Sequence, residues 1–489
     1  MENNDINAAR NEQWRVELRN SKTPKERTTI ERVEMPQLDP AYRITCNEEV
    51  NQGISAEQAM REATRCLDCA NPQCVTGCPV NINIPKFIKN IERGNFAEAA
   101  ATLKETSSLP AVCGRVCPQE KQCESKCIHL KMKHPAVAIG YLERFAADWQ
   151  RNNADSMPAP QVAPKNGIKV AVIGSGPSGL SFAGDMIKRG YDVTVFEALH
   201  EIGGVLKYGI PEFRLPNAIV DFEIDGLRKM GVEFVKDCLV GKTITYDDLH
   251  EMGFKGVFVG SGAGFPRFMD IPGENLNGVM SSNEYLTRIN LMGAGRGGDT
   301  PVLNGKTIAV VGGGNTAMDS TRTAKRMGAE RVILVYRRSE EEMPARLEEV
   351  GHAKEEGIEF MTLHNPIEYI GDDKGRVKAM RVQRMELGEP DASGRRKPVP
   401  VEGAIEEIPV DLVIVAVGVS PNQLVPRSIQ GLEVSKRNTI VVNEETMQSN
   451  VTDLYAGGDI VRGGATVILA MGDGRRAALN MHEMLQVNN

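Results

Sequence analysis

Runs of consecutive apolar residues, each followed by a glycine-rich turn and a helical pattern, occur twice beyond residue 168 of this chain. The first is Lys169–Ile173, and after a helix that ends near Gly190 a second strand is predicted at Asp192–Phe196. The pattern returns at Thr307–Val311 and Arg331–Tyr336. Continuous apolar runs are typical of strands buried on both faces of a parallel sheet, so two βαβ units are predicted.

The N-terminal part shows helical patterns instead. A helix is predicted over 55–65 with Ser55 as its N-cap, and 84–104 predicts two helices divided at Gly94 and Asn95. A further helix is predicted over 139–150, and the polar, proline-rich stretch 151–167 reads as a linker. We therefore expect an α/β protein: a helical domain (1–150), a first dinucleotide-binding domain (168–300 and 421–489) and a second one (301–420) inserted in the first.

The first βαβ unit carries a dinucleotide-binding fingerprint. Gly174, Gly176 and Gly179 form a GxGxxG turn, and Glu197 ends the second strand. The glycines permit a tight turn and a close approach to a pyrophosphate, while the acid accepts a hydrogen bond from a ribose hydroxyl. We expect FAD here, with Pro177 and Ser178 at the same turn; a structural turn without a ligand is the alternative.

The second unit has the related GxGxxA form. Its turn contains Gly312, Gly314, Asn315, Thr316 and Ala317. At the end of its second strand, where the first unit has an acid, stand Arg337 and Arg338. Guanidinium groups suit a 2′-phosphate, so NADPH is expected rather than NADH. A solvated basic strand end is the alternative.

Two C-terminal segments are predicted to complete the FAD-binding domain. Residues 411–418 form a short apolar strand, and Gly457, Gly458 and Asp459 precede a helix predicted over 465–485. Backbone amides and a carboxylate at such a turn can approach flavin ribityl and phosphate oxygens, with Gly458 and Asp459 as the candidates. Asp459 as a simple helix N-cap is the alternative.

Eight of the ten cysteines occur in two groups, each containing a Cys-Pro step. They are Cys66, Cys69, Cys74 and Cys78, then Cys113, Cys117, Cys123 and Cys127. This punctuation is typical of ferredoxin-like ligation, and two [4Fe–4S] clusters are expected. Structural zinc is the less favoured alternative, because it prefers two separated Cys-x2-Cys pairs and only the first two cysteines have that spacing. A disulfide framework is also disfavoured, because it suits small secreted domains.

The ligands can be divided between the clusters because the last cysteine of a run tends to cross to the other cluster. Cys127 is then expected to join the first three cysteines of the first group. Cys78 is expected to join Cys117 and Cys123 in the second cluster, which leaves one corner that Cys113 could fill by spacing.

The net charge and the lengths of the apolar runs limit the classes of partner that this chain is expected to bind. The net charge is −7 and no apolar run approaches the about 18 residues that span a bilayer. We therefore expect no nucleic-acid or membrane partner, and thiolate ligands without an export signal suggest a cytoplasmic protein. Beyond Cys127 only Cys238 remains, so the chain lacks the redox Cys-x-x-Cys of a thiol-disulfide reductase.

The motifs together resemble the small (beta) subunit of NADPH-dependent glutamate synthase and its relatives, from about Ser55 onward. The resemblance is carried by 77–79, 113–118, 172–179, 203–204, 208–211, 214–216, 312–319, 336–338, 343–345 and 456–459. The large subunit of NADH-dependent ferredoxin–NADP oxidoreductase and the N-terminal half of dihydropyrimidine dehydrogenase share this module.

The resemblance implies further site residues. It places the flavin ring near Gly203 and Gly204 and adds Val205, Leu206 and Arg214 as cofactor contacts. It also offers Glu143, in the stretch 139–145, as an oxygen ligand that competes with Cys113 for the open cluster corner.

The implied activity is oxidation of NADPH at FAD and passage of electrons through two [4Fe–4S] clusters to a partner, with no acid–base residue required. A large FMN-containing glutamate synthase subunit, which makes glutamate from glutamine and 2-oxoglutarate, is the first candidate partner. The residues 119–122 before Cys123 are closer to the ferredoxin–NADP oxidoreductase and single-chain glutamate synthase types than to the small subunit of the heterodimeric glutamate synthases. The partner in the ferredoxin–NADP oxidoreductase type is a small ferredoxin-reductase-like flavoprotein.

Overall fold

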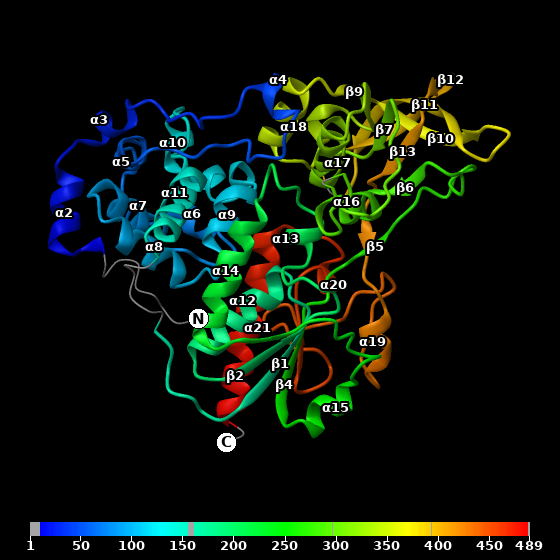
Figure 1. Ribbon diagram of the computed structural model, residues 1–489. Helices are drawn as coiled ribbons and strands as arrows, with labels where there is room; N and C mark the ends of the chain where they lie inside the picture. Colours follow the sequence, from blue (N-terminus) through cyan, green and yellow to red (C-terminus); the bar gives the residue numbers. More distant parts are fainter. Residues whose placement is uncertain (1–9, 155–160, 296, 393, 488–489) are drawn as a thin grey trace.

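The computed structural model describes residues 10–154, 161–295, 297–392 and 394–487. Three lobes are visible: a helical lobe from the N-terminal part, a second lobe that contains the C-terminal helix, and a third lobe built from the middle of the chain (Figure 1). The second and third are built on parallel sheets. The predicted fold class is confirmed, including the insertion of one nucleotide-binding fold in the other.

The N-terminal lobe is entirely helical in its described part. Its elements are α2 (Gln13–Asn20), α3 (Pro24–Thr28), α4 (Pro40–Arg43), α5 (Ala56–Thr64), α6 (Gln73–Thr76), α7 (Ile84–Glu92), α8 (Phe96–Lys104), α9 (Pro110–Val116), η1 (Gln119–Lys121), η2 (Glu124–Lys126), α10 (Ile128–Lys131) and α11 (Ile139–Asn152). The predicted N-cap is present, since Ser55 accepts from the Gln58 amide. At the predicted break between two helices, Asn95 caps α8 by accepting from the Glu98 amide. Helices α2 to α4 precede the segments that the sequence pattern identified.

The first sheet has the strand order β15-β4-β1-β2-β3. Its strands are β1 (Lys169–Ile173), β2 (Asp192–Phe196), β3 (Glu233–Val235), β4 (Phe254–Val259) and β15 (Leu454–Ala456), and its helices are α12 (Pro177–Lys188), α13 (Val205–Tyr208), α14 (Asn217–Met230), α15 (Tyr246–Glu251), α19 (Leu424–Ser428), α20 (Asp459–Arg462) and α21 (Val467–Val487). In β1, Val170 and Val172 enter one core, while Ala171 and Ile173 enter the core on the other face. This explains the continuous apolar run.

The second sheet has the order β6-β13-β7-β8-β9. It comprises β6 (Val279–Ser281), β7 (Thr307–Val311), β8 (Arg331–Tyr336), β9 (Glu359–Thr362) and β13 (Leu412–Val415), with α16 (Ser282–Asn290), α17 (Asn315–Arg326), η4 (Glu340–Glu342) and α18 (Leu347–Glu355). Since β6 pairs with β13, this sheet begins before residue 301, where the sequence-based boundary was placed.

Residues 411–418 lie in the second nucleotide-binding domain, within the bounds 301–420 expected for it, and the assignment of the same residues to completion of the FAD-binding domain is wrong. Strand β13 pairs with β7 of the second sheet, and β15 takes the place beside β4 in the first. Both are short apolar strands, and an apolar run does not reveal which neighbour it pairs with. The turn at 457–459 does follow β15, and the helix predicted over 465–485 is α21, preceded by the short α20.

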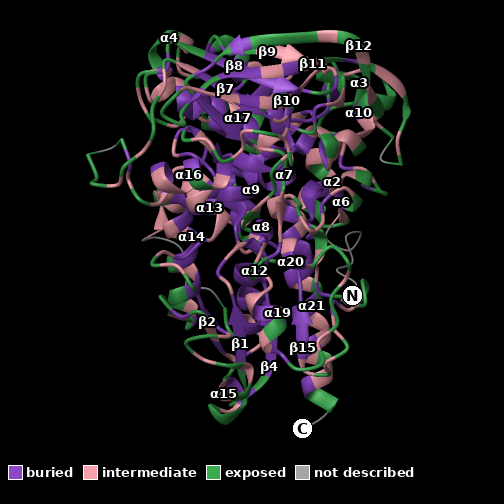
Figure 2. Ribbon diagram, turned by 90° about the vertical axis from the view of Figure 1, so that its right-hand side faces the viewer, coloured by how far each residue is buried: buried purple, intermediate pink, exposed green. Residues whose placement is uncertain are grey.

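Two further sheets were not predicted. β10 (His364–Gly371), β11 (Val377–Pro390) and β12 (Arg396–Pro409) form an antiparallel sheet whose edge strand β12 is largely exposed (Figure 2). β5 (Phe265–Pro266) pairs antiparallel with β14 (Val419–Ser420). The chain enters the second domain through β5 and returns through β14, so its two crossings lie side by side.

One hydrophobic core joins the N-terminal lobe to the first sheet. It includes Phe87 of α7 together with Phe182 of α12 and Met471 of α21, all nearly inaccessible to solvent. The N-terminal domain is thus packed on the first nucleotide-binding domain as one body. Within the described ranges, no helix is both long and apolar enough to cross a membrane.

Candidate functional site

The two glycine turns have the same geometry. Gly174 and Gly312 adopt φ values of +100° and +143°, and a Cβ there would lie 2.6 Å from the Gly260 oxygen and 2.4 Å from the Ala416 oxygen. At Gly176 and Gly314 the nearest atom to such a Cβ is 4.0 Å away. The first glycine of each turn is therefore required by backbone contact, and the second leaves room for a ligand at the helix N-terminus, as a pyrophosphate requires.

Glu197 connects three segments of the first fold. It is buried, and its Oε2 accepts from the Ser175 amide at 2.9 Å and from Ser175 Oγ at 2.6 Å, while Oε1 accepts from the Leu199 amide at 2.9 Å. Ser175 Oγ in turn accepts from the Gly203 amide at 2.9 Å. A carboxylate has about four acceptor positions, so one remains for a ribose hydroxyl.

The loop at Gly203 and Gly204 lies against the GxGxxG turn. Both glycines have positive φ, and a Cβ on Gly204 would lie 3.0 Å from the Gly176 Cα. Helix α13 begins directly afterwards at Val205, whereas the Leu206 side chain is fully buried in the core. The structure therefore brings the predicted loop to the predicted turn.

The C-terminal turn reaches the same place. Gly458 has φ +78°, and a Cβ there would lie 2.8 Å from Ser178 Oγ. Asp459 is the first residue of α20, whose N-cap is Gly458, so the simple N-cap role for its side chain is not observed. Burial, with the charge of Asp473, raises the pKa of Asp459 to about 6. Burial followed by the charges of Asp459 and Glu197 raises the pKa of Tyr208 to about 12.

Arg337 and Arg338, at the end of β8 in the second nucleotide-binding domain, differ in burial and in their hydrogen-bond partners. Arg338 is buried: its Nη2 donates to Asp391 at 2.7 Å and its Nε to the Arg396 carbonyl at 2.8 Å. Arg337 is exposed and makes no hydrogen bond or ion pair within the described residues. Of the other predicted contacts, Asn315 Oδ1 accepts from the Arg346 amide at 2.9 Å, and Thr316 is exposed at the start of α17.

The first expected cysteine set surrounds a cavity. Cys66, Cys69, Cys74 and Cys127 all line a space of about 210 Å³ between the loop after α5 and helix α10. All four are partly exposed. Among the described residues, no three His, Cys, Asp or Glu side chains converge closely enough to hold a single metal ion. The thiols thus surround a volume, as a polynuclear cluster requires, rather than a point.

The second expected set is buried. Cys78, Cys117 and Cys123 are 6–8% exposed, and Cys113 is fully buried. Glu143, on α11, is 6% exposed, and its Oε1 has no hydrogen-bond partner among the residues that the structure describes. Burial raises the pKa of Glu143 to about 8. Besides burial, the charge of the Glu143 carboxylate raises the pKa of all four buried thiols, Cys78, Cys113, Cys117 and Cys123.

An unpartnered buried carboxylate oxygen among three thiols fits a cluster ligand, since such an oxygen is otherwise costly. Cys113 belongs to the same group, because its thiol shares a hydrogen bond with the Cys117 thiol. Its Sγ also lies 3.5 Å from Sδ of Met471, on α21 of the first nucleotide-binding domain. In the same region a Cβ on Gly472 would lie 2.9 Å from the Pro79 oxygen. The second cysteine set therefore adjoins the FAD-binding fold directly.

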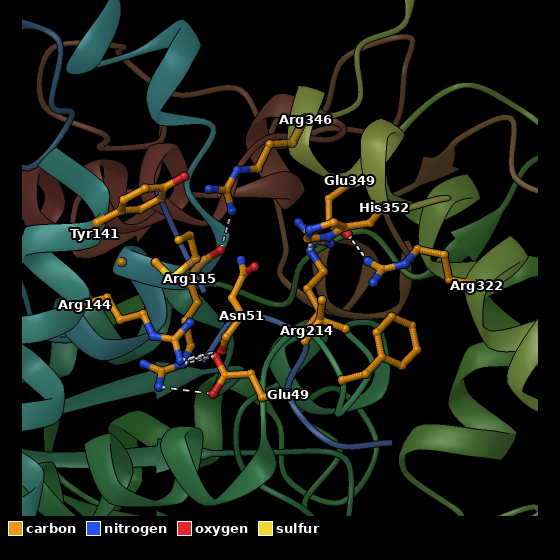
Figure 3. Close-up of a pocket in the computed structure, with 14 residues that line it drawn as sticks. Glu49, Asn51, Arg115, Tyr141, Arg144, Arg214, Arg322, Arg346, Glu349 and His352 are labelled. Carbon is orange, nitrogen blue, oxygen red and sulfur yellow. Dashed lines mark hydrogen bonds and ion pairs between the residues drawn. The ribbon is translucent and has the colours of Figure 1, made fainter. Parts of the chain in front are cut away.

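Arg214, which the resemblance offers as a cofactor contact, is bonded to two carboxylates of the second nucleotide-binding domain. Its Nη1 bonds Asp319 of α17 at 2.8 and 3.1 Å, and its Nε forms an ion pair with Glu349 of α18 at 3.3 Å. It belongs to a junction at which all three domains meet, also lined by Arg115 and Tyr141 (Figure 3). Burial would raise the pKa of Glu349, but Arg214 and Arg322 outweigh it and lower the pKa to about 2.

Several of these residues were not identified from the sequence. Ser175 lies inside the fingerprint as a variable residue, and Asp473 accepts from the Gly458 amide at 3.0 Å although it lies within a helix. The only sequence signal for Asp473 is a carboxylate in an otherwise small and apolar helical stretch, which also fits an exposed helix face.

Comparisons with known proteins cover the whole site. The protein-family model described as dihydropyrimidine dehydrogenase domain II, 4Fe-4S cluster, matches residues 43–155. The family model of pyridine nucleotide-disulphide oxidoreductase matches residues 168–474. The small chain of glutamate synthase [NADPH] from Escherichia coli is 36% identical over 94% of this chain and 98% of its own. The beta subunit of NADP(+)-dependent formate dehydrogenase from Moorella thermoacetica is 38% identical over 84% of this chain and 60% of its own.

A solved structure supports the fold of the two nucleotide-binding domains. Mycobacterium tuberculosis FprA in complex with NADPH matches with a TM-score of 0.56 and 21% identity, over 66% of this chain and 85% of that one. This similarity concerns the fold alone.

Proposed function

Since the chain belongs to the pyridine nucleotide-disulphide oxidoreductases, in the branch with an N-terminal 4Fe-4S domain that includes the glutamate synthase small chains, we propose that it is the NADPH-oxidising small subunit of a glutamate synthase. It is an NADPH-dependent iron–sulfur flavoprotein oxidoreductase with an electron-transfer role. The partner, the number of clusters and the individual ligands are part of the proposal.

When bound, FAD accepts hydride from NADPH and a [4Fe–4S] cluster carries single electrons. The protein's own residues supply binding and orientation. The turn at Gly174 to Gly179, with Glu197 and the Gly458 turn, would hold FAD. The turn at Gly312 to Ala317, with Arg337, would hold NADPH.

The observation that carries the proposal is the placement of the two cysteine sets. The buried set, with Cys113 3.5 Å from Met471, adjoins the FAD-binding fold, while the set around the 210 Å³ cavity is partly exposed. This order suits a subunit that accepts electrons inside and delivers them at its surface. We assign Cys66, Cys69, Cys74 and Cys127 to one cluster, and Cys78, Cys117, Cys123 and Glu143 to the other.

A second candidate is the large subunit of an NADH-dependent ferredoxin–NADP oxidoreductase, a type that the insertion at 119–122 resembles, as it also resembles single-chain glutamate synthases. Anaerobic affinity purification from the native cell distinguishes the two. A large partner that forms glutamate from glutamine and 2-oxoglutarate with NADPH supports the first function. A small ferredoxin-reductase-like flavoprotein without glutamate formation supports the second and contradicts the first.

A further inference from the structure

The surface over the first cysteine set is basic, whereas the chain as a whole is acidic. Lys126 and Lys131 line the cavity of the four cysteines together with His129, and no acidic side chain lines it. Lys133 follows on the same exposed segment. The chain as a whole carries a net charge of −7, so this basic segment is a local reversal of sign.

Nearby acidic groups do not cancel it. Asp68, between two of the cysteines, is fully buried and bonded by Arg15 at 2.6 Å and by Arg19 at 2.8 Å. Glu124 is buried and paired with Arg32 at 2.8 Å. The cations on 126–133 therefore face solvent without a carboxylate partner on that segment.

Apolar side chains lie between these lysines. Leu130 is 46% exposed and Met132 is 40% exposed. An apolar centre flanked by charge is the usual composition of a protein interface, and electron-transfer contacts are small and guided by charge. Helix α10, which carries Leu130, lies in the N-terminal lobe, away from β1, β2 and β4 of the first sheet (Figure 1).

We propose that the segment 126–133 is the docking surface for a protein that presents an acidic face around a one-electron redox centre, and we name it the α10 face. This rests on the proposed function and adds where electrons leave and what receives them. Oxidation of one NADPH to NADP⁺ and a proton releases two electrons, so two such centres are reduced by one electron each per NADPH. A basic face on the donor and an acidic face on the acceptor increase the encounter rate and favour the orientation over the four cysteines.

The test uses the full chain with its cofactors and an acidic two-cluster ferredoxin as the probe. Binding is measured at low and high ionic strength for the wild type and for K126E/K131E/K133E. We expect the variant to bind at least about tenfold more weakly at low ionic strength, and we expect added salt to weaken the wild type, since exposed charges are screened. Carbodiimide coupling followed by mass spectrometry should join ferredoxin carboxylates to these lysines.

Two control variants keep the result specific. K242E/K255E/K436E makes the same change of charge at three exposed lysines of the FAD-binding domain, and K126R/K131R/K133R keeps the charge of the α10 face. Both should bind like the wild type, with unchanged iron content. Equal weakening in the distant variant, or no binding by the wild type, would overturn the docking surface. Bleaching of the flavin by NADPH without ferredoxin tests the proposed function separately.

Discussion

Arg43, in the N-terminal domain, donates from Nε to Oε1 of Glu356 in the second nucleotide-binding domain over 2.8 Å, across 313 positions of sequence. Both side chains are almost completely buried. Glu356 also accepts from Arg322 and from Arg326, at 2.9 and 2.7 Å. One carboxylate therefore holds three guanidinium groups and ties two domains together.

Replacing Glu356 by glutamine should destabilise the protein by about 3–5 kcal/mol, because three buried cations lose the fully buried carboxylate that they share. Thermal and urea unfolding measure the effect. Glu355→Gln is a matched control: Glu355 pairs with the same Arg43 at 2.7 Å, but its side chain is 50% exposed, so a change below about 1 kcal/mol is expected. Similar losses in both variants would show that burial of the pair does not matter.

Acid should weaken the same contact. Burial would raise the pKa of Glu356, but hydrogen bonds from Arg326 and the charge of Arg322 lower it to about 2. A glutamate of the unfolded chain has a pKa of about 4.3, so the unfolded state takes up the proton first as pH falls. The stabilisation is complete above about pH 5 and disappears toward pH 2. The stability difference between wild type and Glu356→Gln should shrink over this interval; a constant difference would contradict the ion pairs.

The arginines at the end of β8 should differ in their effect on NADPH. Arg337 is exposed and available to a 2′-phosphate, whereas Arg338 already holds Asp391. Arg337→Ala should lower kcat/KM for NADPH by about 10- to 100-fold, as expected for a lost charged hydrogen bond, and leave that for NADH unchanged. Steady-state kinetics with both nucleotides measure this.

Arg338→Ala is the comparison for that experiment. It should reduce thermal stability and act on both nucleotides alike, because its partners belong to the protein. If Arg338→Ala alone lost NADPH selectivity, the assignment of Arg337 would be wrong.

The fourth corner of the buried cluster can be tested by iron content. Two cubanes give about eight irons per FAD in the wild type. Glu143→Ala should lose the buried cluster and leave about four irons, whereas Cys113→Ala should retain about eight. Cys46→Ala, outside both cysteine groups, is the control. Loss of iron only in Cys113→Ala would reverse the assignment.

Much of the nucleotide-binding architecture could be predicted from local patterns. Positions 174 and 312 require glycine, because the backbone there has positive φ and touches the end of a neighbouring strand. The glycines in the sequence therefore indicate these turns. The strands β1 and β7 are buried on both faces, so each is a continuous apolar run. The cap at Ser55 is a local hydrogen bond, so it could be predicted from the residues around it.

Partners distant in sequence could not be predicted in this way. Strand 412–415 looked as suitable for the first sheet as for the second, because pairing is decided by packing and not by composition. Arg214 carries the same charge whether it faces a phosphate or Asp319, and only the position of α17 decides between them.

The sequence by itself therefore determined the domain types, the cofactor classes and the eight cysteines, because each depends on residue type and short spacing. The tertiary structure decided that Glu143 Oε1 lies among buried thiols without a partner in the described residues, and that Arg338 is bonded within the protein while Arg337 is exposed. These depend on which surfaces the fold buries together, and burial depends on the whole chain.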